Sequence, residues 1–191
     1  MATALALQTK RLTLREFEAT DWKAVHRYAA DYRVVRYMKW GPNSEDESRD
    51  FVARAIAEQT AVPRTHHNFA ITLAATGQVI GACGLVVRSA EERTGWIGYC
   101  LNRAFWRQGY GTEAARLLLA FGFDELGLHR VYATCDTENL ASARILGKIG
   151  MIREGRLREH QQIKGRWRDS YLFAILDREW DRLQTGIIPP E

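Results

Sequence analysis

The stretch that decides the fold runs Asn102-Arg103-Ala104-Phe105-Trp106-Arg107-Gln108-Gly109-Tyr110-Gly111-Thr112-Glu113-Ala114-Ala115. It follows a strand-like apolar run, 96–101, and leads into a segment whose apolar residues recur at helical spacing. Backbone N–H groups at the start of a helix lack partners, and with the helix dipole they attract anions. Gly109 and Gly111 allow a bulky anion to approach the backbone closely. The stretch therefore predicts a cradle for the diphosphate of a nucleotide-like cofactor.

Spacing separates the known kinds of phosphate-binding loop. A P-loop needs Gly-x-x-x-x-Gly-Lys-Ser/Thr, and a dinucleotide fingerprint needs Gly-x-Gly-x-x-Gly. In this chain Gly109-x-Gly111 is followed by Thr112-Glu113-Ala114, which fits neither pattern. On this motif alone, an ordinary tight turn stays open as the alternative.

A second block follows about one helix and one strand later. It begins with Asn139-Leu140-Ala141-Ser142 and closes with Lys148-Ile149-Gly150-Met151. Together with the opening segment Thr9-Lys10-Arg11-Leu12-Thr13-Leu14-Arg15, the two motifs resemble the GCN5-related N-acetyltransferase (GNAT) superfamily, and most closely its RimJ/RimL-type branch. The resemblance covers roughly residues 9–176.

The resemblance implies a single α/β domain. Its mixed, mostly antiparallel sheet of about six to seven strands would be V-shaped and flanked by about four helices, as the alternation of elements also indicates. Hydrophobic periodicity predicts strands at 12–16, 67–73, 79–87, 93–101, 130–135, 151–162 and 166–176. It predicts helices from 20 or 21 to 30, from a Ser44/Glu47 capping box to 59, from the glycine turn to Gly127, and over 140–149. Around the domain at 9–176 we expect an N-terminal tail at 1–8 and a C-terminal helix or tail at 177–191.

In the family, the cofactor is acetyl-CoA. The resemblance assigns its diphosphate to the backbone of Arg107, Gln108, Gly109, Tyr110, Gly111 and Thr112. Trp106 stands where the family motif has Gln or Arg, a departure that backbone bonds tolerate. Main-chain groups of Tyr99, Cys100 and Leu101 would serve the pantetheine arm and the thioester oxygen. Asn139 and Lys148 are further candidate contacts, although Asn139 is also a good helix N-cap and Lys148 a plain charge at a helix end.

Ser142 is the candidate catalytic side chain. It shares the apolar stripe of its helix with Ile145, Leu146 and Ile149, so its hydroxyl points inward and needs a partner. Many relatives carry a Tyr at the position of Leu146 as the acid for the departing thiolate, and in the RimL-type pattern a Ser lies beside the cofactor sulfur instead. The alternative is a hydroxyl bonded to its own helix backbone.

The general base is less well marked. Relatives often carry a Glu where this chain has Trp96. Glu159, His160, Asp169 and Asp136 are the other candidates, each with a purely structural alternative. An α-amine has a pKa of about 7.7–8.0 and a lysine about 10.4, so an enzyme without a strong base suits an N-terminal amine better.

Composition bounds the class of protein. The 191 residues, 46% hydrophobic and 26% charged, are typical of one well-buried globular domain. A net charge of +4 is too mild to predict nucleic-acid binding. Cys83, Cys100 and Cys135 lie in apolar runs, as reduced thiols of a cytoplasmic protein would. We expect no metal site, no membrane span, and a monomer or homodimer. A local basic cluster, either a solvated face or a rim for an acidic partner, comprises Arg153, Arg156, Arg158, Lys164, Arg166 and Arg168.

These observations favour an acetyl-CoA-dependent N-acetyltransferase acting on a primary amine, with a protein N-terminus as the favoured acceptor. A small amine, such as a polyamine, an amino acid or an antibiotic amine, is the first alternative. A catalytically silent acyl-CoA-binding module is the second, and a nucleic-acid-binding domain is weaker still, because the charge is modest.

Overall fold

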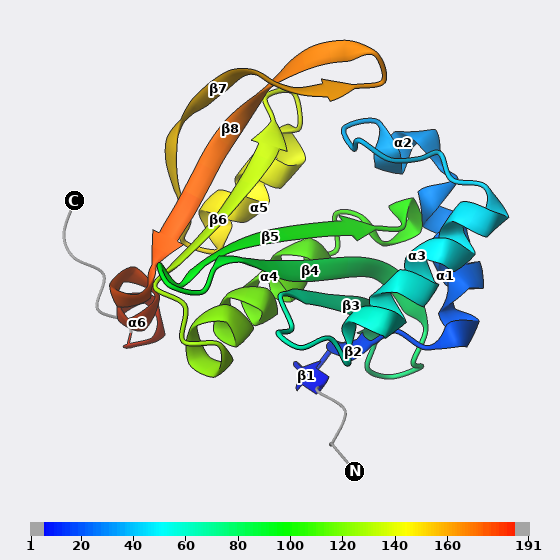
Figure 1. Ribbon diagram of the computed structural model, residues 1–191, viewed down its shortest axis with the longest axis horizontal. Helices are drawn as coiled ribbons and strands as arrows, with labels where there is room; N and C mark the ends of the chain where they lie inside the picture. The colour runs from blue at the N-terminus through cyan, green and yellow to red at the C-terminus, as the bar shows by residue number, and fades with distance from the viewer. Residues whose placement is uncertain (1–5, 186–191) are drawn as a thin grey trace.

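The computed structural model describes residues 6–185, in which eight strands form one mixed sheet in the order β1-β2-β3-β4-β5-β6-β8-β7 (Figure 1). The pair β5–β6 is parallel, and the other neighbouring pairs are antiparallel. The strands are β1 (Ala6–Gln8), β2 (Leu12–Glu16), β3 (His66–Leu73), β4 (Val79–Ser89), β5 (Thr94–Leu101), β6 (Arg130–Asp136), β7 (Ile152–Ile163) and β8 (Arg166–Leu176).

Helices cover both faces of the sheet and enclose two apolar cores. One core lies under α4 and α5, and the other under α1, α2 and α3 (Figure 1). The described helices are α1 (Trp22–Ala29), α2 (Tyr32–Val35), α3 (Glu45–Glu58), α4 (Tyr110–Ala120), α5 (Leu140–Lys148) and α6 (Asp177–Thr185). None of them is long and apolar enough to cross a bilayer.

The predicted fold class is confirmed, and residues 6–185 contain eight strands in place of six to seven and six α-helices in place of four. Ser44 caps α3 as predicted, and its hydroxyl and the Glu47 carboxylate form the reciprocal capping box. The helix after the glycine turn ends at Ala120 and continues as a π-helical turn over Phe121–Glu125, before the left-handed Gly127.

The N-terminal boundary needs correction. Residues 6–8, expected in a tail, form β1 and pair antiparallel with β2, with Leu7 opposite Leu14. Three residues are too few to show a strand period, and the four-residue α2 was missed for the same reason. In the expected C-terminal segment α6 occupies 177–185, while the tail residues 1–5 and 186–191 lie outside the described part of the chain.

His67 on β3 is a buried imidazole without a polar partner. Its side chain packs edge-on against Phe121, with 5.0 Å between ring centroids, and only 6% of the residue is exposed. Within residues 6–185, neither ring nitrogen has a hydrogen-bond partner. Burial, assisted by the nearby charge of Arg64, lowers the pKa of His67 to about 4. The imidazole is therefore neutral in the folded protein at pH 7.

We expect this histidine to make the fold sensitive to acid. The unfolded imidazole has a pKa of about 6.5, so between about pH 6.5 and pH 4 the unfolded chain binds more protons than the folded one. The free energy of unfolding should be undiminished above pH 6.5 and should fall toward pH 4, by up to about 1.4 kcal/mol per pH unit from this group. Denaturant titrations across this range should show a shallower pH slope for His67→Phe. An equal slope in both proteins would contradict the assignment.

Candidate functional site

A wedge opens in the sheet where β5 and β6 separate. The two strands pair in parallel only over Thr94–Trp96 and 130–132, while β5 continues to Leu101 and β6 to Asp136. Figure 1 shows them diverging, β5 with the horizontal half of the sheet and β6 with the rising half. From Ile97 onward this side of β5 has no strand partner among the described residues. An unpaired edge offers N–H and C=O groups to an extended ligand.

The loop between β5 and α4 leaves a row of backbone donors free. Arg107 and Gly109 adopt left-handed conformations, with φ values of 60° and 86°. The N–H groups of residues 107–112 donate to no acceptor in the described part of the chain. Because α4 begins at Tyr110, these donors lie at the positive end of an eleven-residue helix. The arrangement suits a diphosphate.

The two glycines of this loop serve different purposes. A Cβ on Gly109 would lie 3.2 Å from Nη2 of Arg11, in a left-handed conformation that side chains rarely adopt. A Cβ on Gly111 would lie 3.0 Å from Cδ1 of Ile145 and 3.5 Å from Cδ1 of Leu101. Gly109 therefore shapes the loop, whereas Gly111 lets the start of α4 pack closely against α5 and the end of β5. This packing brings the loop, the open edge and α5 together.

Trp106 and Cys100 define the end of β5. The indole Nε1 of Trp106 donates a 2.8 Å hydrogen bond to the carbonyl of Leu101, which fastens the loop to the strand. The Leu101 carbonyl, one of the main-chain groups predicted to bind the cofactor, therefore already accepts one hydrogen bond. The Cys100 side chain packs against the α1–α3 core, on the face opposite α5, and burial raises the pKa of its thiol to about 12. Only the main chain of Cys100 is placed to serve a ligand in the wedge.

Ser142 finds its partner across the wedge. The hydroxyls of Ser142 and Tyr99 lie 3.1 Å apart, and the Tyr99 hydroxyl also donates to the Ser142 carbonyl at 3.4 Å. Burial raises the pKa of Tyr99 well above its usual value, so the phenol is protonated. Only the main chain of Tyr99 was predicted to contact the cofactor, and its hydroxyl was not among the predicted site groups. The available signal was strand alternation, which puts Tyr99 on the same face as Ile97 and Leu101, toward α5.

Asn139 and Lys148, the two remaining residues predicted to contact the cofactor, lie at opposite ends of α5. Asn139 is the N-cap, and its side-chain oxygen accepts a 3.2 Å hydrogen bond from the Ser142 N–H. Asn139 therefore lies one turn from the hydroxyl pair. Lys148 ends the same helix, about 13 Å farther along its axis at 1.5 Å per residue. Its carbonyl accepts a hydrogen bond from Arg116. The structure brings Asn139 and Ser142 together and leaves Lys148 at the far end.

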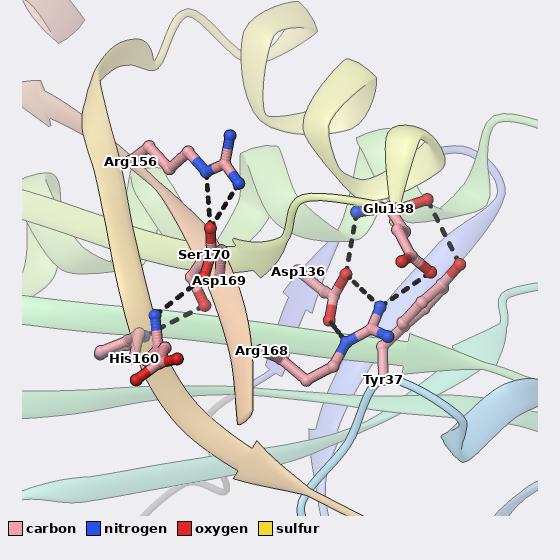
Figure 2. Close-up of polar contacts among 9 residues, drawn as sticks. Tyr37, Asp136, Glu138, Arg156, His160, Arg168, Asp169 and Ser170 are labelled. Atoms are coloured by element: carbon pink, nitrogen blue, oxygen red, sulfur yellow. Dashed lines mark hydrogen bonds and ion pairs between the residues drawn. The ribbon is translucent and has the colours of Figure 1, made fainter. Parts of the chain in front are cut away.

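Of the four candidate bases, Asp136 is neutralised by a buried ion pair. Its side chain is 2% exposed and accepts two hydrogen bonds from Arg168, of 2.7 and 2.8 Å (Figure 2). The N–H of Glu138 donates a third, and the Glu138 carboxylate also binds Arg168. The two oxygens of this buried carboxylate are therefore already occupied by donors from within the protein.

Of the other three candidates, Glu159 and His160 lie on β7, and Asp169 lies on β8. Figure 2 shows His160 and Asp169 with their partners. Asp169 accepts hydrogen bonds from the Glu159 N–H, at 2.8 Å, and from Arg156, and these lower its pKa. Glu159 has a φ of 46° in a bulge of β7, which positions that N–H. Nδ1 of His160 lies 3.1 Å from the buried Ser170 hydroxyl. Burial, with the charge of Lys39, lowers the pKa of His160, so its imidazole is neutral at pH 7.

A segment that the sequence analysis did not assign joins this cluster. The Tyr37 hydroxyl donates to the Glu138 carbonyl at 3.3 Å, and the Arg168 guanidinium lies 5.8 Å from the Tyr37 ring centroid. Nζ of Lys164, in the β7–β8 turn, donates to the Trp40 carbonyl at 2.8 Å. Residues 37–41 and the hairpin thus face each other across one side of the wedge (Figure 1). The available signal was a pair of aromatic residues, Tyr37 and Trp40, in a segment without a predicted element.

Comparison with known proteins agrees with this geometry. Residues 11–152 match the family described as acetyltransferase (GNAT) domain. The chain is 36% identical to YnaD of Bacillus subtilis (strain 168), an uncharacterized N-acetyltransferase, over 92% of this chain and 99% of YnaD. It is 26% identical to spermidine N(1)-acetyltransferase of Escherichia coli (strain K12), over 87% of each chain.

Solved structures extend the comparison to the predicted branch. RimL, the ribosomal L7/L12 alpha-N-protein acetyltransferase, superposes with a TM-score of 0.79 over 91% of this chain and 95% of its own. At 18% sequence identity, this superposition shows that the two proteins share a fold and says nothing about the acceptor. Membership of the RimJ/RimL-type branch therefore stays a prediction.

Proposed function

We propose that this chain, which belongs to the GNAT family of acetyltransferases, transfers an acetyl group from acetyl-CoA to the α-amine of a protein N-terminus. In this reaction the amine would attack the thioester directly. One observation carries the proposal. The free N–H groups of residues 107–112 open onto the same wedge as the unpaired edge of β5 and the Ser142–Tyr99 hydroxyl pair. A diphosphate, a pantetheine arm and a thioester need these three features in this order.

The residues of the wedge fit acetyl-CoA. The backbone of residues 107–112 would hold the diphosphate, and the edge of β5 would pair with the amide groups of the pantetheine arm. Asn139 lies close enough to Ser142 to contact the same ligand. Lys148, at the far end of α5, would reach only a distal part of it. When bound, acetyl-CoA supplies the acetyl group as an activated thioester.

Ser142 would donate a hydrogen bond to the departing sulfur. The Tyr99 phenol holds the Ser142 hydroxyl in place, and its raised pKa keeps it a donor. The chain therefore has an O–H donor at this point although Leu146 replaces the Tyr of many relatives. Protonation of a departing thiolate is ordinary general-acid chemistry.

The acceptor side explains the preference for an α-amine. The carboxylates of Asp136 and Asp169 are both held by arginines. Trp96, at the position where relatives often carry a Glu, packs its ring over Gly98. With these candidates occupied or replaced, the amine would arrive neutral, which an α-amine does far more often than a lysine at pH 7. The proton would leave through solvent.

Ser142→Ala is expected to lower kcat by about 10²-fold, with little change in the KM for acetyl-CoA, because a proton donor acts in the transition state. Stopped-flow or steady-state thiol release measures both constants. Arg130→Met, which breaks a surface ion pair with Glu154, serves as a control that should leave kcat unchanged. A kcat for Ser142→Ala within about threefold of the parent would return Ser142 to a structural role.

A small-amine acceptor is the alternative with a specific observation behind it, since one relative is a spermidine N(1)-acetyltransferase. Two cations on this side of the wedge, Lys39 beside His160 and Lys164 on the β7–β8 turn, disfavour a polycation. Purified protein should release thiol faster with N-terminal peptides than with polyamines or amino acids. The reverse order would establish the small-amine function, and no turnover with any amine would favour a silent binding module.

We also propose a cytoplasmic location. Cys83, Cys100 and Cys135 are all free thiols, which are typical of a reducing compartment and support this proposal.

A further inference from the structure

The geometry points to Arg11, just before β2, as the positioning residue for the cofactor's diphosphate. Arg11 holds the 107–112 loop in shape and neutralises Glu113, which would otherwise repel the diphosphate. This inference rests on the proposed function, because it takes the loop to be the diphosphate site. It gives the opening segment of the chain a part in cofactor binding, separate from its place in the sheet.

Arg11 contacts the loop from outside the row of free donors. Its Nη1 donates a 3.0 Å hydrogen bond to the Gln108 carbonyl, and its guanidinium lies 4.8 Å from the ring centroid of Tyr110. Gln108 lies between the two left-handed residues of the loop, Arg107 and Gly109. The Gln108 carbonyl and the Gly109 N–H belong to one planar peptide group and point in opposite directions. By holding the carbonyl, Arg11 therefore also orients the Gly109 N–H.

Glu113 is the second partner of Arg11. Nε of Arg11 donates to Oε2 of Glu113 at 2.8 Å, and Nη2 of Arg11 contacts the same oxygen. The Thr9 hydroxyl binds the other carboxylate oxygen. Thr9 is itself fixed in the β1–β2 turn, because its hydroxyl accepts a 3.0 Å hydrogen bond from the Leu12 N–H. Both oxygens of a carboxylate that is 17% exposed are therefore held by this turn.

The position of Glu113 makes its neutralisation important. It lies in the first turn of α4, next to the free N–H groups. A carboxylate there stabilises the helix, but it competes with any other anion for the same positive end. The guanidinium of Arg11 cancels its charge and leaves the helix end available to a diphosphate. Arg11 is itself 49% exposed, so it adds little burial to the fold.

The test compares ligands with and without a diphosphate. Arg11→Met is expected to raise the Kd for CoA by about tenfold or more, the usual effect of losing charge-assisted hydrogen bonds. Turnover of S-acetylpantetheine, a thioester without the diphosphate, should not change relative to the parent. Arg130→Met is the matched control, because it breaks another Arg–Glu pair at the opposite end of β5. That variant should bind CoA like the parent.

A double-mutant cycle tests the electrostatic part. In Arg11→Met the Glu113 charge is unbalanced, so adding Glu113→Gln should recover a substantial part of the lost CoA affinity. Glu113→Gln alone should bind CoA at least as tightly as the parent. If Arg11→Met also slows turnover of S-acetylpantetheine equally, Arg11 supports the fold in general and the inference is overturned. Unchanged CoA binding in Arg11→Met overturns it too.

The outcomes separate this inference from the proposed function. If the parent binds CoA but Arg11→Met binds it equally well, only the role of Arg11 is lost. If the parent protein binds no CoA at all, the proposed function itself fails.

Discussion

Replacing Gly109 with Val is expected to abolish acetyl-CoA binding while leaving the fold in place. Gly109 has a φ of 86°, a conformation that is strongly unfavourable for a β-branched residue. Its added Cβ would also lie 3.2 Å from Nη2 of Arg11 and would crowd the row of free N–H groups. The loop would have to change shape, and the donors would no longer converge on one anion.

Isothermal calorimetry with acetyl-CoA measures this effect. Gly77→Val is the matched control, because Gly77 in the β3–β4 turn has a φ of 70° and no atom within 4 Å of an added Cβ. It should suffer similar backbone strain and still bind acetyl-CoA. Affinity close to that of the parent in Gly109→Val would remove the loop from the cofactor site.

The acceptor preference should be as large an effect. An amine of pKa about 7.8 is roughly 14% neutral at pH 7, and one of pKa about 10.4 is roughly 0.04% neutral, a difference of several hundredfold. Because Asp136 and Asp169 are held by arginines, we expect the enzyme to depend on this neutral fraction. The rate at subsaturating amine should rise with pH until it reaches the substrate's own pKa.

The measurement is kcat/KM against pH for two peptides. One has a free α-amine, and the other is blocked at its N-terminus and carries a lysine. The α-amine peptide should be the better substrate near neutrality, with each profile bending at its own amine's pKa. A faster lysine peptide at pH 7, or a single bend shared by both profiles, would contradict this account. A shared bend below about pH 6.5 would identify His160 as the base, since burial lowers its pKa from that value. His160→Gln would then remove the bend.

Local sequence patterns account for most of the elements. The capping box of α3 joins Ser44 to Glu47, three residues away, and the glycine turn is set by the φ of residues 107 and 109. Such features depend on backbone sterics and hydrogen bonds within one turn, so the residues carry the information themselves. Elements of three or four residues, such as β1 and α2, are too short to show a period and form because a neighbour offers them a surface.

The candidate site divides in the same way. The Gly-x-Gly loop and the Asn139 cap are readable in the sequence, because each lies within a few residues of the helix it serves. The pairs that give the site its chemistry are not. Tyr99 and Ser142 are 43 residues apart, Asp136 and Arg168 are 32 apart, and Arg11 and Glu113 are 102 apart.

These distant pairs meet because β5 and β6 diverge and because β2 brings its preceding turn beside the start of α4. Whether a carboxylate is free or neutralised depends on which charge the sheet register places beside it. Asp136 and Asp169 read as candidate bases in the sequence and are ion-paired in the fold. The kind of chemistry therefore follows from local motifs, whereas the protonation state and orientation of each group follow from packing, since electrostatic interactions act between neighbours in space.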